Sequence, residues 1–171
     1  MAPACLTVLL PIHPGQEDAL QHLLRSTGDD IKGRQAIAHD VPRIDFLRTT
    51  QTHFARLAVL NDPDRGPDRA RLLFASAYDG ALDEHLAEIL AATSDPDAIW
   101  GKCEGYPGPA GFAAFMRAHA HDPAAFYVAF RDETVRSITR ALEPRRAQSP
   151  NPRPGPPPAP LPFPLRVILF L

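Results

Sequence analysis

Two short stretches of the sequence hold the side chains best suited to chemistry. In Thr52–Arg56, His53 and Arg56 fall on opposite faces of an apolar strand pattern. A histidine on a sheet face could act as a base or ligate a haem iron, whereas a hydrogen-bonded structural role is the commoner use of such a residue. Arg56 suits an ion pair or an anionic ligand better than catalysis.

The second stretch is Leu73–Gly80, which ends a strand pattern at the start of a helix. Ser76 and Tyr78 share one face of that strand, so both are candidates for lining a ligand pocket. Core packing with the hydroxyl at the rim is the simpler role for Tyr78. Asp79 directly precedes the helix, and we expect it to cap the helix at Ala81.

A third group of candidates lies in residues 94–111, a segment rich in glycine and proline. Its candidates for a binding rim, or for plugging one end of a sheet, are Trp100, Glu104 and Tyr106. Cys103 has no partner at CxxC spacing, and His119 and His121 lack a third ligand. The spacing therefore predicts no metal site and assembles no nucleophilic triad.

Alternating apolar residues predict the elements that must position these side chains. The predicted strands are Leu6–Ile12, Thr52–Leu60, Arg71–Tyr78 and Ala125–Phe130. The polar Pro/Gly turn between the second and third predicts a hairpin. Apolar residues at helical spacing predict helices from Gln16 to the late twenties or beyond, at Ala81–Ala92 and at Glu133–Leu142, with shorter ones around Ile99 and at Phe112–His119.

The resulting order, β-α-β-β-α-β, predicts an α+β domain of the ferredoxin-like type. Such a domain has an antiparallel sheet with helices on one face, and here extra helices are added. Each strand pattern carries apolar residues on both faces, so we expect the second face of the sheet to be covered. A second copy packing sheet to sheet is the favoured cover; the extra helices or a ligand are the alternatives.

Composition limits the class of protein. The chain has 171 residues, 44% hydrophobic and 22% charged, with a net charge of -2. These values predict one globular domain and argue against nucleic acid as the main partner. Cys5 and Cys103 are expected to be two unrelated reduced thiols. The N-terminal stretch does not resemble a signal peptide, so a cytoplasmic location is expected.

Proline content changes sharply near Arg145. We expect residues 1–144 to form the domain and residues 145–171 to form a proline-rich linker or tail that favours polyproline II. The tail ends in Leu165–Leu171, which is too short to cross a bilayer. It could instead dock on a membrane surface or on a partner protein.

Three motifs carry a resemblance to a group of poorly characterised bacterial proteins with ferredoxin-like modules. They are His53–Arg56, Leu73–Gly80, and Ile99–Trp100 together with Glu104–Pro107. The resemblance covers residues 5–140 and implies the fold, but it names no reaction.

More distantly, the strand and helix order is similar to that of the dimeric α/β-barrel superfamily. That likeness implies dimers formed sheet to sheet, and the superfamily includes haem-binding dye-decolorising peroxidases, chlorite dismutases and small oxygenases. The peroxidases carry a Gly-x-x-Asp-Gly motif. Here Gly80–Asp83 matches its first four positions, but Glu84 replaces the final glycine. The haem assignment is therefore not carried over, and no cofactor is predicted from it.

Three functions stay open on the sequence alone. The first is a non-catalytic ligand-binding or interaction module that forms a homodimer through its sheet. The second is a haem- or small-substrate-dependent oxidoreductase, with His53 as ligand or base and with Arg56 and Tyr78 lining the pocket. The third is a peripheral membrane or scaffold protein that docks through Leu165–Leu171.

Overall fold

The computed structural model describes residues 3–33, 44–61 and 70–148. The chain divides into two compact units, Met1–Ile138 and Thr139–Leu171, and the first unit contains the sheet and the core. The dense prolines of the predicted tail and the apolar segment Leu165–Leu171 lie outside the described residues.

Three antiparallel strands form one sheet in the order β1-β3-β2. They are β1 (Ala4–Pro11), β2 (Thr52–Leu60) and β3 (Arg71–Tyr78). The central strand β3 pairs with β1 from Ala4↔Tyr78 to Pro11↔Arg71, and its antiparallel pairing with β2 is the predicted hairpin. The predicted α+β class is thus confirmed, and the bounds of β2 and β3 are those that alternation predicted.

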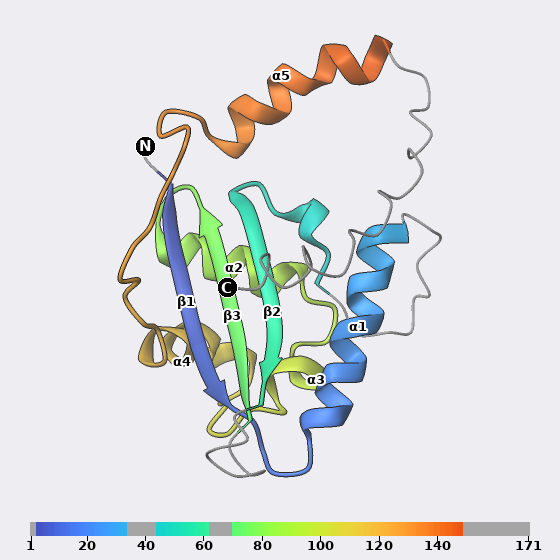
Figure 1. Ribbon diagram of the computed structural model, residues 1–171, viewed down its shortest axis with the longest axis vertical. Coiled ribbons are helices and arrows are strands. Elements are labelled where there is room, and N and C mark those ends of the chain that lie inside the picture. Colours follow the sequence, from blue (N-terminus) through green and yellow to red (C-terminus); the bar gives the residue numbers. More distant parts are fainter. Residues whose placement is uncertain (1–2, 34–43, 62–69, 149–171) are drawn as a thin grey trace, which may run out of the picture. The chain divides into compact units, whose positions relative to one another are not determined.

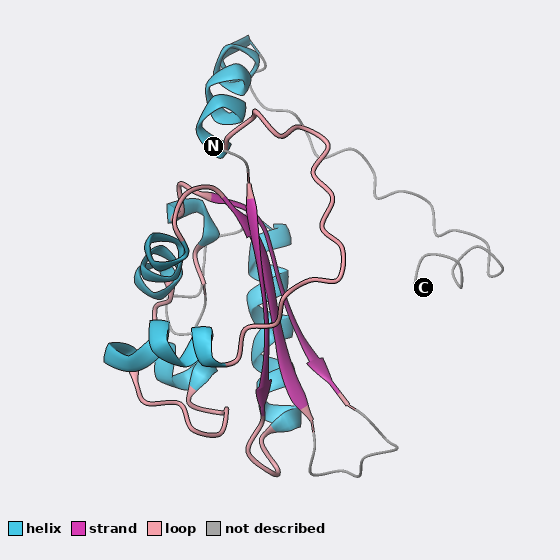
Figure 2. Ribbon diagram, turned by 90° about the vertical axis from the view of Figure 1, so that its left-hand side faces the viewer, coloured by secondary structure: helices cyan, strands magenta, loops and turns pink. Residues whose placement is uncertain are grey.

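Every predicted helix is present among the described residues. The helices are α1 (Glu17–Gly33), α2 (Leu82–Ala92), α3 (Pro96–Trp100), α4 (Phe112–Ala118) and α5 (Val135–Gln148), with 3-10 turns η1 (Phe46–Arg48) and η4 (Pro109–Gly111). In Figure 1, α2 and α4 lie behind the sheet and α1 runs alongside β2. Figure 2 shows the sheet nearly edge-on, with α2 and α4 on one side of it.

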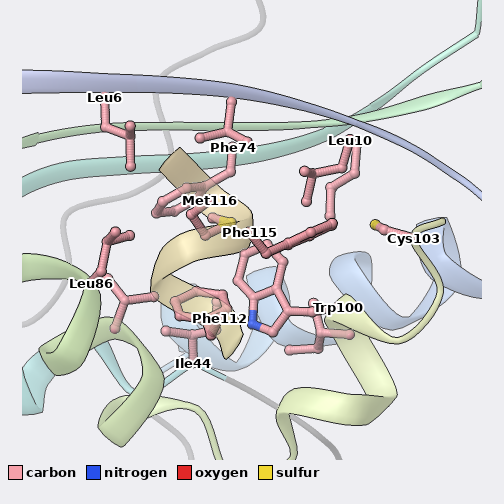
Figure 3. Packing of buried hydrophobic residues seen from close by; sticks show 14 of the residues in the cluster. Leu6, Leu10, Ile44, Phe74, Leu86, Trp100, Cys103, Phe112, Phe115 and Met116 are labelled. Carbon is pink, nitrogen blue, oxygen red and sulfur yellow. The ribbon is translucent and has the colours of Figure 1, made fainter. Parts of the chain in front are cut away.

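One apolar core fills the space between the sheet and these helices (Figure 3). The strands and helices send into it residues such as Leu6, Leu10, Leu20, Leu72, Leu86 and Ile89. Trp100 is fully buried, and its ring lies 5.6 Å from that of Phe74 and 5.3 Å from that of Phe112, centroid to centroid. The apolar residues that recur at strand spacing and those that recur at helical spacing therefore pack against each other on the face of the sheet that the helices cover.

The predicted fourth strand is wrong for this structure: residues 125–130 form no strand. The chain begins to pair with the free edge of β1, where Val8 faces Ala120 in an isolated antiparallel bridge. The Leu9 amide donates to the His119 carbonyl, and the His121 amide donates to the Thr7 carbonyl. The next rung in this register would join Cys5 to Pro123, which has no N–H, so the ladder stops.

The predicted polyproline segment also starts too early, because residues 145–148 continue α5. Arginine, alanine and glutamine are good helix formers, so they extend the helix past Pro144. The dense prolines begin only at Pro150. The boundary at residue 144 therefore falls inside a helix.

Candidate functional site

Polar side chains gather where β3 ends, β2 begins and α2 starts. We call this group the polar corner; its members are Gln51, Thr52, His53, Ser76, Tyr78, Asp79 and His85. A tight turn at Gly80 makes the corner possible, since this residue has φ +82° and a Cβ there would lie 2.7 Å from Gln51 Oε1. Glycine alone avoids both the strain and the clash.

His53 is held in the polar corner by Asp79. A β-bulge between Thr52 and Phe54 leaves His53 without a residue opposite it on β3, which re-aims its side chain. Its Nε2 lies 2.8 Å from Asp79 Oδ1, and the histidine side chain is half-buried at 19% exposure. A hydrogen-bonded structural role was the commoner of the two roles considered for His53 from the sequence, and its contact with Asp79 is such a hydrogen bond.

Asp79 does not cap α2, so that prediction is wrong. The N-cap residue of α2 is Ala81, and it has no side-chain cap. The second oxygen of Asp79, Oδ2, accepts a hydrogen bond from the Val135 amide at 2.8 Å. Asp79 therefore fastens the start of α5 to the end of β3, since an orphan N–H of the first helical turn finds its acceptor there.

A second polar pair lies deeper, under the helices. Ser76 Oγ is 2.8 Å from His85 Nε2, and both side chains are buried. The ring of Tyr78 stacks on that of His85 at 4.2 Å with an interplanar angle of 2°. Burial lowers the pKa of His85 to about 4, although nearby Glu88 acts in the opposite direction. His85 is therefore neutral near pH 7.

Sequence reasoning missed His85. It lies on the apolar stripe of α2, three residues after Leu82 and four before Ile89. A polar residue on such a stripe must find a buried partner, so the helical periodicity alone could have marked it. Its partner is Ser76, which the strand pattern had placed on one face with Tyr78 as a candidate for lining a pocket.

The distance between Ser76 and His85 is that of a catalytic nucleophile and its base. The pair lacks the orienting group and the substrate access that catalysis also requires. A catalytic histidine is oriented by a group on its second ring nitrogen. The Nδ1 atom of His85 has no hydrogen-bond partner among the described residues, and the residue is 0% exposed. Substrate has no direct access to such a pair, so its main effect is to fix α2 on β3.

The other sequence candidates lie away from the polar corner. Arg56 is exposed on the opposite face of the sheet from Ser76 and Tyr78. The loop after α3 is fastened to the far end of β1, where the Glu104 amide donates to the Pro11 carbonyl. Trp100 is core, while Glu104 is exposed. Tyr106 is half-buried against Phe115, and burial, followed by nearby Asp97, raises its pKa to about 12.

Neither cysteine is poised for thiolate chemistry. Burial raises the pKa of the Cys103 thiol to about 12. Burial and then Asp122 raise the pKa of Cys5. A thiol whose pKa lies above its ordinary value is a poor nucleophile at neutral pH. Across the described ranges, no three histidine, cysteine or acidic side chains group together as metal ligands would.

The face of the sheet turned away from α2 and α4 is mainly apolar. We call it the open face. Its residues, in strand order, are Cys5, Thr7, Leu9, Pro11, Phe54, Arg56, Ala58, Leu60, Arg71, Leu73, Ala75 and Ala77. Phe54 is 53% exposed and Leu60 is 40% exposed. Along the central strand β3 it is lined by two small side chains, Ala75 and Ala77, followed towards the start of the strand by Leu73 and Arg71.

No protein-family model matches the chain, and no similar curated protein or solved structure was found. The likenesses to the bacterial group and to dimeric α/β-barrel proteins stay predictions. Within residues 3–33, 44–61 and 70–148, none of the helices has the length and apolarity that crossing a membrane requires.

Proposed function

We propose that this chain is a non-catalytic interaction module that forms a homodimer through its open face. The observation that carries the proposal is the open face itself, with Phe54 and Leu60 exposed beside Leu73, Ala75 and Ala77 of β3. The fold would be a variant of the ferredoxin-like plan in which three strands, β1, β3 and β2, form the sheet.

Leaving such a face in water is unfavourable. Burying a phenylalanine or leucine side chain fully is worth about 1.5–3 kcal/mol relative to exposing it. The helix-covered face of the same strands obtains this stabilisation from the core. The open face obtains it only when another surface covers it, so an apolar face of this kind marks an interaction site.

The size of the open face argues for more than a simple face-to-face contact. Three strands of about eight residues give a face of roughly 14 Å by 26 Å, on the order of 370 Å². A stable interface buries about 800 Å² on each partner. The remaining area has to come from elements beside the sheet, and the exposed aromatic residues after α4 are available for it.

Sedimentation equilibrium of the full chain tests the proposal. We expect a dimer for the unmodified protein and a monomer for Phe54→Lys, because a second cation beside Arg56 on the open face is repelled by it and is costly to bury. Ala91→Glu is the matched control, since Ala91 is exposed on α2 and remote from the open face. A wild-type monomer at every concentration, or equal loss of dimer in both variants, contradicts the proposal.

A small-molecule enzyme is the second candidate, and one observation favours it. A half-buried imidazole oriented by a carboxylate, as in His53–Asp79, is the usual arrangement of a base or of a metal-ligating histidine. Titration of the protein with haemin tests the haem form of this idea. A Soret band that disappears in His53→Ala would support it, and a protein that takes up no haemin would exclude it.

Docking through Leu165–Leu171 is the third candidate from the sequence. That segment lies outside the described residues, so only its composition supports the idea. A chain ending at Gln148 should then lose association with anionic vesicles or partner protein, whereas unchanged association would exclude this role.

A further inference from the structure

Residues 122–134 form an arm that is fastened at both ends. At its start, the His121 amide is bonded to the Thr7 carbonyl on the edge of β1. At its finish, the Val135 amide is bonded to Asp79, directly after β3. Tyr78 pairs with Ala4, so the two attachment points are only about three residues apart along the sheet, roughly 10 Å.

The arm is much longer than this separation requires. Its residues 122–134 could span on the order of 40 Å if extended. Three aromatic side chains of the arm meet water: Phe126 at 42% exposure, Tyr127 at 84% and Phe130 at 74%. The sequence Ala125–Phe130 has the β-branched and aromatic character of a strand, yet the arm carries it into solvent.

The arm has no place in the sheet of its own chain. In the register set by Val8↔Ala120, the rung after Pro123 would join Ala125 to Pro3. Proline has no N–H, so both of these rungs lack a donor. The strand-like segment Phe126–Phe130 is thus separated from the edge of β1 by two rungs that each lack a donor.

We propose that residues Ala125–Phe130 lie on the open face of a second copy of this chain, where they act as the missing strand-like element of the interface. This inference rests on the proposed homodimer and names the part of each chain that completes it. The large aromatic side chains of the arm complement the small residues Ala75 and Ala77 in the middle of the open face. Two arms exchanged about a two-fold axis make the contact self-complementary.

The exchange of arms between two copies also supplies buried area that the open face alone lacks. Each copy then buries its own arm as well as its own open face, which raises the buried surface above what the open face offers alone. The aromatic side chains of the arm are of the type that dominates interface energetics, since rigid rings bury much area at low entropic cost. The high exposure of Tyr127 shows that its own chain does not supply this burial.

Cross-linking between two separately purified variants tests the inference. One variant carries Tyr127→Cys and the other Ala75→Cys, both with Cys5→Ser because Cys5 shares the open face. Cys103 is fully buried and stays unreactive in the folded protein. When the two are mixed with a short bis-maleimide, we expect a product of doubled mass whose linked peptides contain positions 127 and 75. Ala91→Cys replaces Ala75→Cys in the control and should give little product.

The outcomes separate the inference from the proposed function. A wild-type dimer that gives no link between positions 127 and 75 overturns the arm exchange and leaves the homodimer standing. A monomer overturns both. A link that forms only within one chain, seen when both cysteines are placed in the same molecule, also overturns the exchange. As a second measurement, Tyr127→Ser with Phe130→Ser should weaken dimerisation about tenfold or more while circular dichroism stays unchanged.

Discussion

The two faces of the sheet are built from the same three strands and differ in what covers them. On β3, Leu72 and Phe74 point to the helices and are fully buried, while Leu73 and Ala75 alternate with them on the open face and are half-buried. Both faces are mainly apolar. The apolar residues of the strands therefore mark both faces as surfaces that are unfavourable to expose to water, whereas the helices of the same chain cover one of these faces. The difference teaches that an apolar strand pattern does not by itself show which face of the sheet the chain's own helices cover.

The largest expected effect is on the free energy of unfolding, and it differs between two neighbouring residues of β3 that lie on opposite faces of the sheet. Phe74→Ala should reduce the free energy of unfolding by about 3–5 kcal/mol, because it opens a cavity against Trp100. Leu73→Ala, one residue earlier, should cost about 1 kcal/mol or less in the monomer. Urea unfolding at low protein concentration measures both. Equal losses would show that the open face is already buried within one chain.

The next effect comes from the histidine beneath the helix-covered face. Because burial lowers the pKa of His85 from 6.5 to about 4, the unfolded chain binds a proton between these values that the folded chain does not. Its contribution to stability is full above pH 6.5 and is lost as the pH falls towards 4, by about 3 kcal/mol.

Unfolding free energies measured from pH 7 to pH 4 test this loss. The double variant Ser76→Ala with His85→Phe keeps the aromatic stack on Tyr78 and removes the titrating group. Its stability should fall less steeply with acid than that of the unmodified protein. Identical pH profiles would mean that the pKa of His85 does not differ between the folded and the unfolded chain.

A smaller effect is expected at the attachment of the arm. Asp79→Asn removes the charge that accepts hydrogen bonds from His53 and Val135, so it should cost about 1–2 kcal/mol. Hydrogen exchange at Val135 should become faster. Asp83→Asn is the matched control, because its ion pair with Arg117 is on the surface and is worth little. Unchanged exchange at Val135 would show that the start of α5 is held by other contacts.

The smallest effect on the single chain concerns the open face. Phe54→Thr should change the unfolding free energy of the monomer by less than about 0.5 kcal/mol, since Phe54 is more than half exposed. In the unmodified protein, Tm should rise with protein concentration because association stabilises the folded state. The variant should lose that dependence. A variant that keeps it would place the interface elsewhere.

Periodicity predicted the three strands and all the helices because each buries one face against a common core. The prediction of a fourth strand was wrong for a reason that the periodicity of the sequence does not show. Its pairing depends on register, and Pro3 and Pro123 occupy the rungs that had to donate. The polyproline prediction failed locally, because residues 145–148 follow the helix preference of their own side chains.

The candidate site was predictable in part. His53, Ser76 and Tyr78 lie towards the same end of the sheet, but His53 bonds to Asp79, whereas Ser76 and Tyr78 contact His85. The role of Asp79 depended on Val135, more than fifty residues later, and no local pattern reports such a contact. His85 required recognising a polar residue on an apolar stripe, and Arg56 was separated from Tyr78 by the alternation of the sheet itself.

The strand order β1-β3-β2 also sets an order of folding. Strands β2 and β3 are neighbours in the sequence, so pairing them closes a short loop. Pairing β1 with β3 joins Ala4 to Tyr78 and closes a much longer one. Closing the longer loop costs more chain entropy, so β1 should dock after the hairpin has formed. During synthesis, Leu6, Val8 and Leu10 of β1 therefore emerge before β3 and stay unburied until β3 has been made. Among the strands of this sheet, β1 is the one exposed longest to aggregation.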